Sequence, residues 1–198
     1  MRRTAAALAA ALCLVTLAAC NGDDAAFTGT RLDPPFTVLA TPLTGTDGQP
    51  YSLADDTDKP LTLVFFGYTN CPDICGVVMS NLGSAMTRLD ASDRDRVDVV
   101  FVTTDPTRDT APVLEKYVHR FDPSFLGLTG DIDTISAVAM PLGVGVEQGQ
   151  KLPSGGYDVT HGTSVTAIDG DDEGTVYWDQ ATSSAQYAAD IHTLLNED

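Results

Sequence analysis

The most informative segment of the chain is LTLVFFGYTNCPDIC, residues 61–75. Its first seven residues form a continuous apolar run that ends at Gly67, which is typical of a strand buried on both faces of a sheet. Two cysteines, Cys71 and Cys75, follow within eight residues of that glycine. The segment therefore predicts a buried strand that passes into a helix through a junction carrying two thiols.

A helix is expected directly after this junction. Apolar residues recur on one helical face at Val78, Leu82, Ala85 and Leu89. Asn70 is a suitable N-cap and Pro72 suits the first turn. Residues four apart share one side of a helical turn, so the sulfurs of Cys71 and Cys75 can reach one partner atom. The positive end of the helix dipole favours thiolate over thiol at this position.

Such a pair of sulfurs can form a disulfide or bind a soft metal ion. Cu(I) is the leading candidate because thiolate ligands select it. Zinc is less favoured, since a closed structural zinc site needs four ligands and only two cysteines are local. The structural alternative is a stabilising disulfide, or two buried thiols that pack as small apolar groups.

The remainder of the chain alternates strands with helices. Expected strands span residues 36–40, 97–104, 125–130, 164–169 and 175–178, and expected helices begin near Thr110, Asp131 and before Tyr187. Asp47-Gly48 marks a hairpin turn near the start of this pattern. The pattern predicts one α/β domain with a mixed central sheet flanked by helices.

Two smaller predictions concern side chains close to the junction. Met79 and Met86 share a helical face with Leu82, so we expect both to fill the core rather than to act as thioether ligands. Asp105 and Arg108 are expected to form a pair that stabilises the turn in TTDPTRDT.

The first nineteen residues have the features of an export signal. Arg2 and Arg3 precede a short apolar run, and the run ends at Leu17-Ala18-Ala19-Cys20, which resembles a bacterial lipobox. An ordinary signal peptide that ends near a cysteine is the alternative. We expect residues 1–19 to be a lipoprotein signal peptide, Cys20 to carry the lipid, residues 20–35 to form a flexible tether, and residues 36–198 to form the domain.

Composition excludes one class of partner. The chain has 198 residues, 28 acidic and 11 basic side chains, and a formal net charge of −17. Removal of residues 1–19 would leave 9 basic against 28 acidic side chains, a net charge of −19. A surface this acidic, without a basic stripe, does not bind nucleic acid.

Three motifs together resemble the Sco/SenC family of thioredoxin-like copper chaperones. They are YTNCPDIC, TTDPTRDTAPVLEKYVHRFDPSFLGLTG and YDVTHGTS, within a resemblance that covers about residues 36–195. The resemblance implies a thioredoxin-like fold with an N-terminal hairpin extension. It also implies that copper is held by Cys71, Cys75 and His161, and that the protein helps to assemble the dinuclear copper centre of cytochrome c oxidase. The implied partner is the copper-receiving subunit of that oxidase.

Two residues depart from the family pattern without removing a ligand. Gly76 stands where proline is usual after the second cysteine, and Thr160 stands before the histidine where aspartate is common. The first change could loosen the start of the helix, and the second removes a carboxylate that could orient the imidazole. Position alone selects His161 only weakly over His119 and His192; the resemblance makes it the clear choice.

The leading function is a copper chaperone, exported and lipid-anchored to the outer face of the bacterial cytoplasmic membrane, rather than an enzyme. The alternative is a thiol–disulfide oxidoreductase in which Cys71 attacks, Cys75 resolves and His161 is dispensable. A peroxiredoxin-like peroxidase is suggested by the fold alone, and the sequence has no matching motif.

Overall fold

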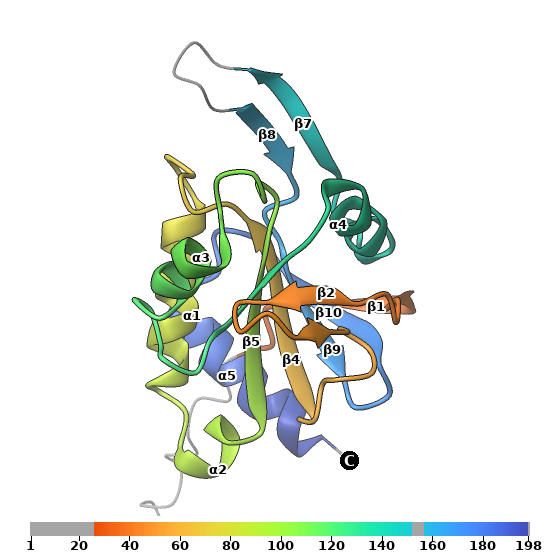
Figure 1. Ribbon diagram of the computed structural model, residues 1–198. Helices are drawn as coiled ribbons and strands as arrows, with labels where there is room; N and C mark the ends of the chain where they lie inside the picture. The colour runs from red at the N-terminus through yellow and green to blue at the C-terminus, as the bar shows by residue number, and fades with distance from the viewer. Residues whose placement is uncertain (1–25, 152–156, 198) are drawn as a thin grey trace, which may run out of the picture.

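The computed structural model describes residues 26–151 and 157–197 (Figure 1). Its main sheet has eight strands in the order β1-β10-β9-β4-β5-β6-β2-β3, and β7 pairs separately with β8. The strands are β1 Thr30–Thr37, β2 Leu43–Gly45, β3 Pro50–Tyr51, β4 Leu61–Gly67, β5 Val97–Thr103, β6 Leu126–Thr129, β7 Val146–Lys151, β8 Tyr157–His161, β9 Val165–Asp169 and β10 Glu173–Trp178. Strands β4, β5 and β6 are parallel and the other pairs are antiparallel.

The central strand β4 is buried along its whole length, as the apolar run predicts. Successive side chains of a strand point to opposite faces. Leu63 and Phe65 accordingly belong to the core on one face of the sheet, and Val64 and Phe66 belong to the core on the other. This double burial explains why the sequence of β4 shows no polar alternation.

Helices cover both faces of the sheet (Figure 1). The helices are α1 Cys75–Met86, α2 Ala91–Arg94, α3 Ala111–Val118, α4 Ile132–Ala139, the short 3-10 helix η1 Met140–Leu142 and α5 Ser184–Asn196. Buried residues of α1, α3 and α5 pack on the face that carries Phe65, and those of α4 pack on the face that carries Phe66. The predicted mixed sheet flanked by helices is confirmed.

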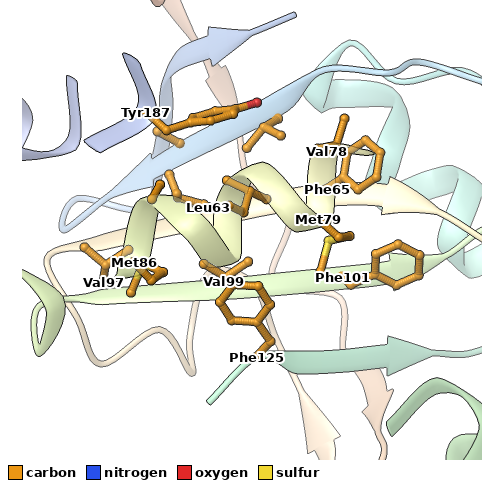
Figure 2. Packing of buried hydrophobic residues seen from close by; sticks show 14 of the residues in the cluster. Leu63, Phe65, Val78, Met79, Met86, Val97, Val99, Phe101, Phe125 and Tyr187 are labelled. Carbon is orange, nitrogen blue, oxygen red and sulfur yellow. The ribbon is translucent and has the colours of Figure 1, made fainter. Parts of the chain in front are cut away.

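Helix α1 fills the middle of the larger core (Figure 2). Met79 and Met86 are 0% and 2% exposed in this cluster, so their prediction as core residues is confirmed. Figure 2 shows Met79 turned toward Phe101 of β5. The helix that bears the second cysteine is therefore anchored to the central strands along its buried side.

Two hairpins extend the domain. Strands β2 and β3 are joined by the predicted Asp47-Gly48 turn, in which Gly48 has a φ of 80° and its N–H donates to Gly45 O at 2.9 Å. Glycine suits this turn because it adopts positive φ without steric cost. Strands β7 and β8 form a separate hairpin that projects beyond the end of the main sheet at which α1 begins (Figure 1).

The N-terminal boundary of the domain differs from the prediction. We expected a tether up to residue 35, but Thr30–Thr37 forms β1 and pairs with β10 at the edge of the sheet. Just before β1, the backbone N–H groups of Thr28 and Gly29 donate to the buried carboxylate of Asp190. The prediction of a tether over residues 30–35 is therefore wrong. Edge strands tolerate proline, and an edge strand need not show an apolar periodicity in its sequence.

The expected signal peptide (residues 1–19) and Cys20 lie outside the described residues. Among the residues that the structure describes, no helix is long and apolar enough to cross a membrane.

Candidate metal centre

The two cysteines lie at the carboxyl end of β4, where a seven-residue loop leads into α1. The helix begins at Cys75, with Ile74 as its N-cap, and no side chain caps it by a hydrogen bond to oxygen. The prediction of Asn70 as N-cap and of Pro72 in the first turn is therefore wrong. Residues 71–74 instead form an irregular turn that carries the chain to the helix.

The sulfur of Cys71 occupies the place where a capping oxygen would be expected. The backbone N–H of Cys75 donates to Cys71 Sγ at 3.5 Å, and the N–H of Cys71 donates to Tyr68 O at 3.1 Å. The first N–H groups of a helix lack intrahelical partners, so a sulfur that accepts from one of them is held at the helix start. The two cysteines thus meet, as predicted, through the loop rather than across a helical turn.

The two thiols differ in exposure and in pKa. Burial acts to raise the pKa of Cys71, but hydrogen bonds from the Cys75 side chain and from the N–H groups of residues 73–75 outweigh it and lower that pKa. Cys75 is 0% exposed, and burial followed by its hydrogen bond to Cys71 raises its pKa. The expectation of thiolate character at both positions is corrected: Cys71 is the favoured thiolate, and Cys75 is the thiol that donates to it.

Gly67 makes room for the buried sulfur. A Cβ at this position would lie 3.0 Å from Cys75 Sγ and 3.0 Å from Phe101 Cε2. A Cβ at this distance would require the neighbours to give by a few tenths of an ångström, so glycine suits a strand end that passes so close to the sulfur. The glycine that ends the predicted strand is thus part of the site, a role that the sequence prediction did not assign.

Tyr117 of α3 adds an aromatic side chain to the same region. Its ring centroid is 5.2 Å from that of Phe101, and the side chain is only 6% exposed. Burial, followed by the charges of Cys75 and Cys71, raises the pKa of Tyr117. Tyr117 therefore stays neutral beside the sulfurs.

Asp109 fixes the loop that carries the cysteines. One carboxylate oxygen accepts from Thr69 Oγ1 at 2.6 Å, and the other accepts from the Thr69 N–H at 2.9 Å and from Thr103 Oγ1 at 2.7 Å. The side chain is 0% exposed, so these bonds replace its hydration. Sequence reasoning missed this role, although Asp109 lies within the TTDPTRDT motif that it treated as structural.

The predicted pair of Asp105 and Arg108 is confirmed. Arg108 Nε donates to Asp105 Oδ2, and Arg108 Cζ lies 5.8 Å from the centre of the Tyr68 ring. Asp105 is only 2% exposed, so this carboxylate is shielded from water. The TTDPTRDT loop is therefore tied to itself by Arg108 and to the cysteine loop by Asp109.

His161 ends β8, and its side chain lies outside what the structure describes. Its Cα faces that of Val146 in β7, and the chain reaches Val165, the first residue of β9, four residues later. Val165 pairs with Phe65, close to the carboxyl end of β4. The topology thus brings the backbone after His161 to the end of the sheet where the cysteine loop begins.

The other two histidines serve different parts of the molecule. His192 Nδ1 lies 2.6 Å from Asp93 Oδ2 and links α5 to α2, and His119 is exposed at the C-cap of α3. Across the described residues, no three side chains of His, Cys, Asp or Glu gather to hold a metal ion.

Comparisons with known proteins point to one family. The SCO1/SenC family model matches residues 29–196. Protein SCO2 homolog, mitochondrial, from Mus musculus is 32% identical over 145 residues, which cover 73% of this chain and 56% of that protein. The chain spans about half the length of several curated relatives that it matches.

Solved structures give the same result. Apo Sco1 from Thermus thermophilus superimposes with a TM-score of 0.76 at 33% identity, covering 85% of this chain and 96% of that one. Copper-bound ScoI from Bradyrhizobium japonicum has a TM-score of 0.67 at 28% identity, with 84% and 99% coverage. These similarities confirm the predicted thioredoxin-like fold.

Proposed function

The chain belongs to the SCO1/SenC family, and from that premise we propose that it is a copper chaperone that loads the dinuclear copper centre of cytochrome c oxidase. The observation that carries this proposal is the contact between Cys71 and Cys75, in which the partly exposed sulfur of Cys71, whose pKa is lowered, accepts a hydrogen bond at 3.5 Å from the backbone N–H of the buried Cys75. Copper-bound ScoI from Bradyrhizobium japonicum shares the fold and supports the identity of the metal.

The donor set fits copper as cargo. Two sulfurs at one helix start suit Cu(I), which prefers soft thiolate ligands. Metal binding requires Cys75 to lose its proton, so copper must displace the hydrogen bond between the two sulfurs. His161 would complete a three-ligand site, and the course of β8 and β9 is compatible with that role.

Exposure of one sulfur suits a protein that releases its metal. Cys71 is partly exposed, whereas Cys75 is fully buried. A thiol of the copper-receiving subunit can approach the metal from the Cys71 side and replace that ligand first. Copper then passes by ligand exchange, and no substrate bond is broken.

The proposal includes an export route and a membrane anchor. Residues 1–19 would be removed as a lipoprotein signal peptide, and Cys20 would carry the lipid on the outer face of the cytoplasmic membrane. The hydrogen bonds from Thr28 and Gly29 to Asp190 support a domain that begins close to this anchor. Residues 21–26 would then form a short tether, since Phe27 already packs against the core.

A second function, thiol–disulfide exchange, is favoured by the same asymmetry. The Cys71 thiolate would attack one sulfur of a disulfide in the recipient and expel the other as a thiolate. Cys75 would then pass its proton to that thiolate and attack Cys71, which releases the second recipient sulfur. The recipient gains one thiol and one thiolate, which takes its proton from water, and Cys71 and Cys75 become a disulfide.

The deciding experiment compares His161→Ala with His119→Ala, a matched control at an exposed histidine. Cu(I) affinity is measured by competition with a chromogenic chelator, and thiol–disulfide exchange is measured with a peptide disulfide. We expect His161→Ala to weaken copper binding by at least about tenfold while exchange persists. Unchanged copper affinity would show that the metal site is misassigned, and exchange that persists beside unchanged copper affinity would favour the second function, for which His161 is dispensable.

A further inference from the structure

A pocket of about 190 Å³ opens beside the cysteine loop. Its lining residues are Thr69, Asn70, Val113, Lys116, Tyr117 and Arg120. Two of them, Thr69 and Asn70, directly precede Cys71 in the chain. A group bound in this pocket therefore lies beside the loop that carries the more exposed sulfur.

Two cations border the pocket, and both come from α3 and the turn that follows it. Lys116 and Arg120 are exposed, and no carboxylate of the described residues forms an ion pair with either of them. The Arg120 guanidinium lies 4.9 Å from the centre of the Tyr117 ring and 5.7 Å from that of Phe121. Contact with these ring faces holds the cation at the pocket without neutralising it.

This arrangement contrasts with the rest of the surface. The chain carries a net charge of −17, and four of its other cations are neutralised locally. Ion pairs join Arg31 to Glu197, Lys59 to Asp98, Arg94 to Asp122 and Arg108 to Asp105. Arg88 and Arg96 also have no ion pair among the described residues, but neither of them lines the pocket. Lys116 and Arg120 therefore form an attractive site for an anion beside the cysteine loop of a molecule whose net charge is negative.

An exposed apolar side chain belongs to the same pocket. Val113 lines it and is 44% exposed. An apolar rim beside two open cations suits a polypeptide, which offers both a carboxylate and apolar contact.

We propose that this pocket docks an acidic segment of the protein that exchanges copper or thiols with Cys71. A Glu or Asp carboxylate of the partner lies between Lys116 and Arg120, apolar atoms of the segment contact Val113, and a nearby partner cysteine reaches Cys71. The inference rests on the proposed function for the presence of that cysteine. An anionic membrane surface fits less well, because basic clusters that bind membranes have roughly four to eight cations and the pocket has two.

The test uses two peptides that differ only in charge, acetyl-EGCGE-amide and acetyl-QGCGQ-amide, each with its cysteine activated as a pyridyl disulfide. Attack by the Cys71 thiolate forms a mixed disulfide with the peptide and releases pyridine-thione, whose absorbance gives the rate. The measured quantity is the ratio of the rate for the acidic peptide to the rate for the neutral peptide. This ratio cancels any change in the intrinsic reactivity of Cys71.

We expect the double variant Lys116→Gln/Arg120→Gln to lower this ratio by about three- to tenfold at low salt. The matched control is Arg88→Gln/Arg96→Gln, which removes the same charge near the far end of α1, about 18 Å from its start. The control should lower the ratio by less than about twofold, as expected for a distant, screened charge.

An unchanged ratio in the pocket variant, or an equal fall in the control, would overturn the proposal. A second contrary result would be that the unaltered protein sediments with phosphatidylglycerol vesicles and the pocket variant does not. That result would assign the two cations to membrane binding and would also overturn the proposal. Copper affinity measured on the same proteins distinguishes failure of the proposed function from failure of the docking proposal. If the unaltered chain does not bind copper, the proposed function is refuted, and the peptide rate ratio still tests docking at the pocket.

Discussion

Thr69 and Asp109 are joined by two hydrogen bonds, one from the Thr69 N–H at 2.9 Å and one from its Oγ1 at 2.6 Å. These bonds connect the loop before Cys71 to the loop before α3. The position of the exposed sulfur therefore depends on a buried carboxylate forty residues away in the chain.

Substitution of Asp109 should damage both stability and the site. In Asp109→Asn the side chain keeps one acceptor oxygen and gains an N–H₂ group that faces donors, so we expect a loss of about 2 kcal/mol in the free energy of unfolding. Urea unfolding measures this loss, with the exposed Asp133→Asn as control. Stability equal to that of the control would contradict the role assigned to the carboxylate.

Alkylation of the thiols should depend on pH in different ways. The thiolate is the reactive form, so the lowered pKa of Cys71 predicts a rate midpoint below that of an ordinary cysteine, and burial should keep Cys75 slow. Cys75→Ala removes the side-chain donor and should raise the midpoint of Cys71. Mass spectrometry after timed iodoacetamide treatment across pH measures both, and faster labelling of Cys75 would refute the asymmetry.

Two glycines near the sulfurs predict opposite effects of the same substitution. A Cβ on Gly67 would lie 3.0 Å from Cys75 Sγ, so Gly67→Ala should destabilise the protein by about 1–3 kcal/mol. A Cβ on Gly76 meets nothing within 4 Å, and this residue lies in α1, so Gly76→Ala should stabilise by up to about 1 kcal/mol. Thermal unfolding of both variants checks the signs, and two changes of the same sign would contradict the structure.

Asp190 joins the N-terminal segment to the core. It accepts hydrogen bonds from Trp178 Nε1 at 2.7 Å, from Thr28 Oγ1 at 2.8 Å and from the Gly29 N–H at 2.8 Å. Asp190→Asn should lower the free energy of unfolding by about 2 kcal/mol and alter the fluorescence of Trp178. Glu115→Gln, at an exposed residue of α3, is the control. An Asp190→Asn variant as stable as this control would contradict the role assigned to Asp190.

The sequence predicted the parts of the fold that depend on local patterns. Strand β4 was predicted because burial on both faces requires a continuous apolar run. Helix α1 was predicted because burial on one face requires apolar residues at helical spacing. The edge strand β1 was missed because it is stabilised by pairing with β10, which is distant in the chain. This pairing does not require an alternating apolar pattern in residues 30–35.

The site was predicted in composition but not in geometry. Cys71 and Cys75 were identified from their spacing, yet their unequal pKa values arise from the burial of one sulfur by Gly67, Phe101 and the core. Asp109 was missed because its partners, Thr69 and Thr103, are brought to it only by the parallel pairing of β4 and β5. Neither relationship can be read from neighbouring residues alone.

The most direct test of the central claim is X-ray absorption at the copper edge of the Cu(I)-loaded protein, compared with His161→Ala. The account predicts two sulfur ligands and one imidazole nitrogen in the unaltered protein, and loss of the imidazole scattering with both sulfurs retained in the variant. A spectrum with one sulfur, or an imidazole signal that persists in His161→Ala, would contradict the assignment of Cys71, Cys75 and His161 as the copper site.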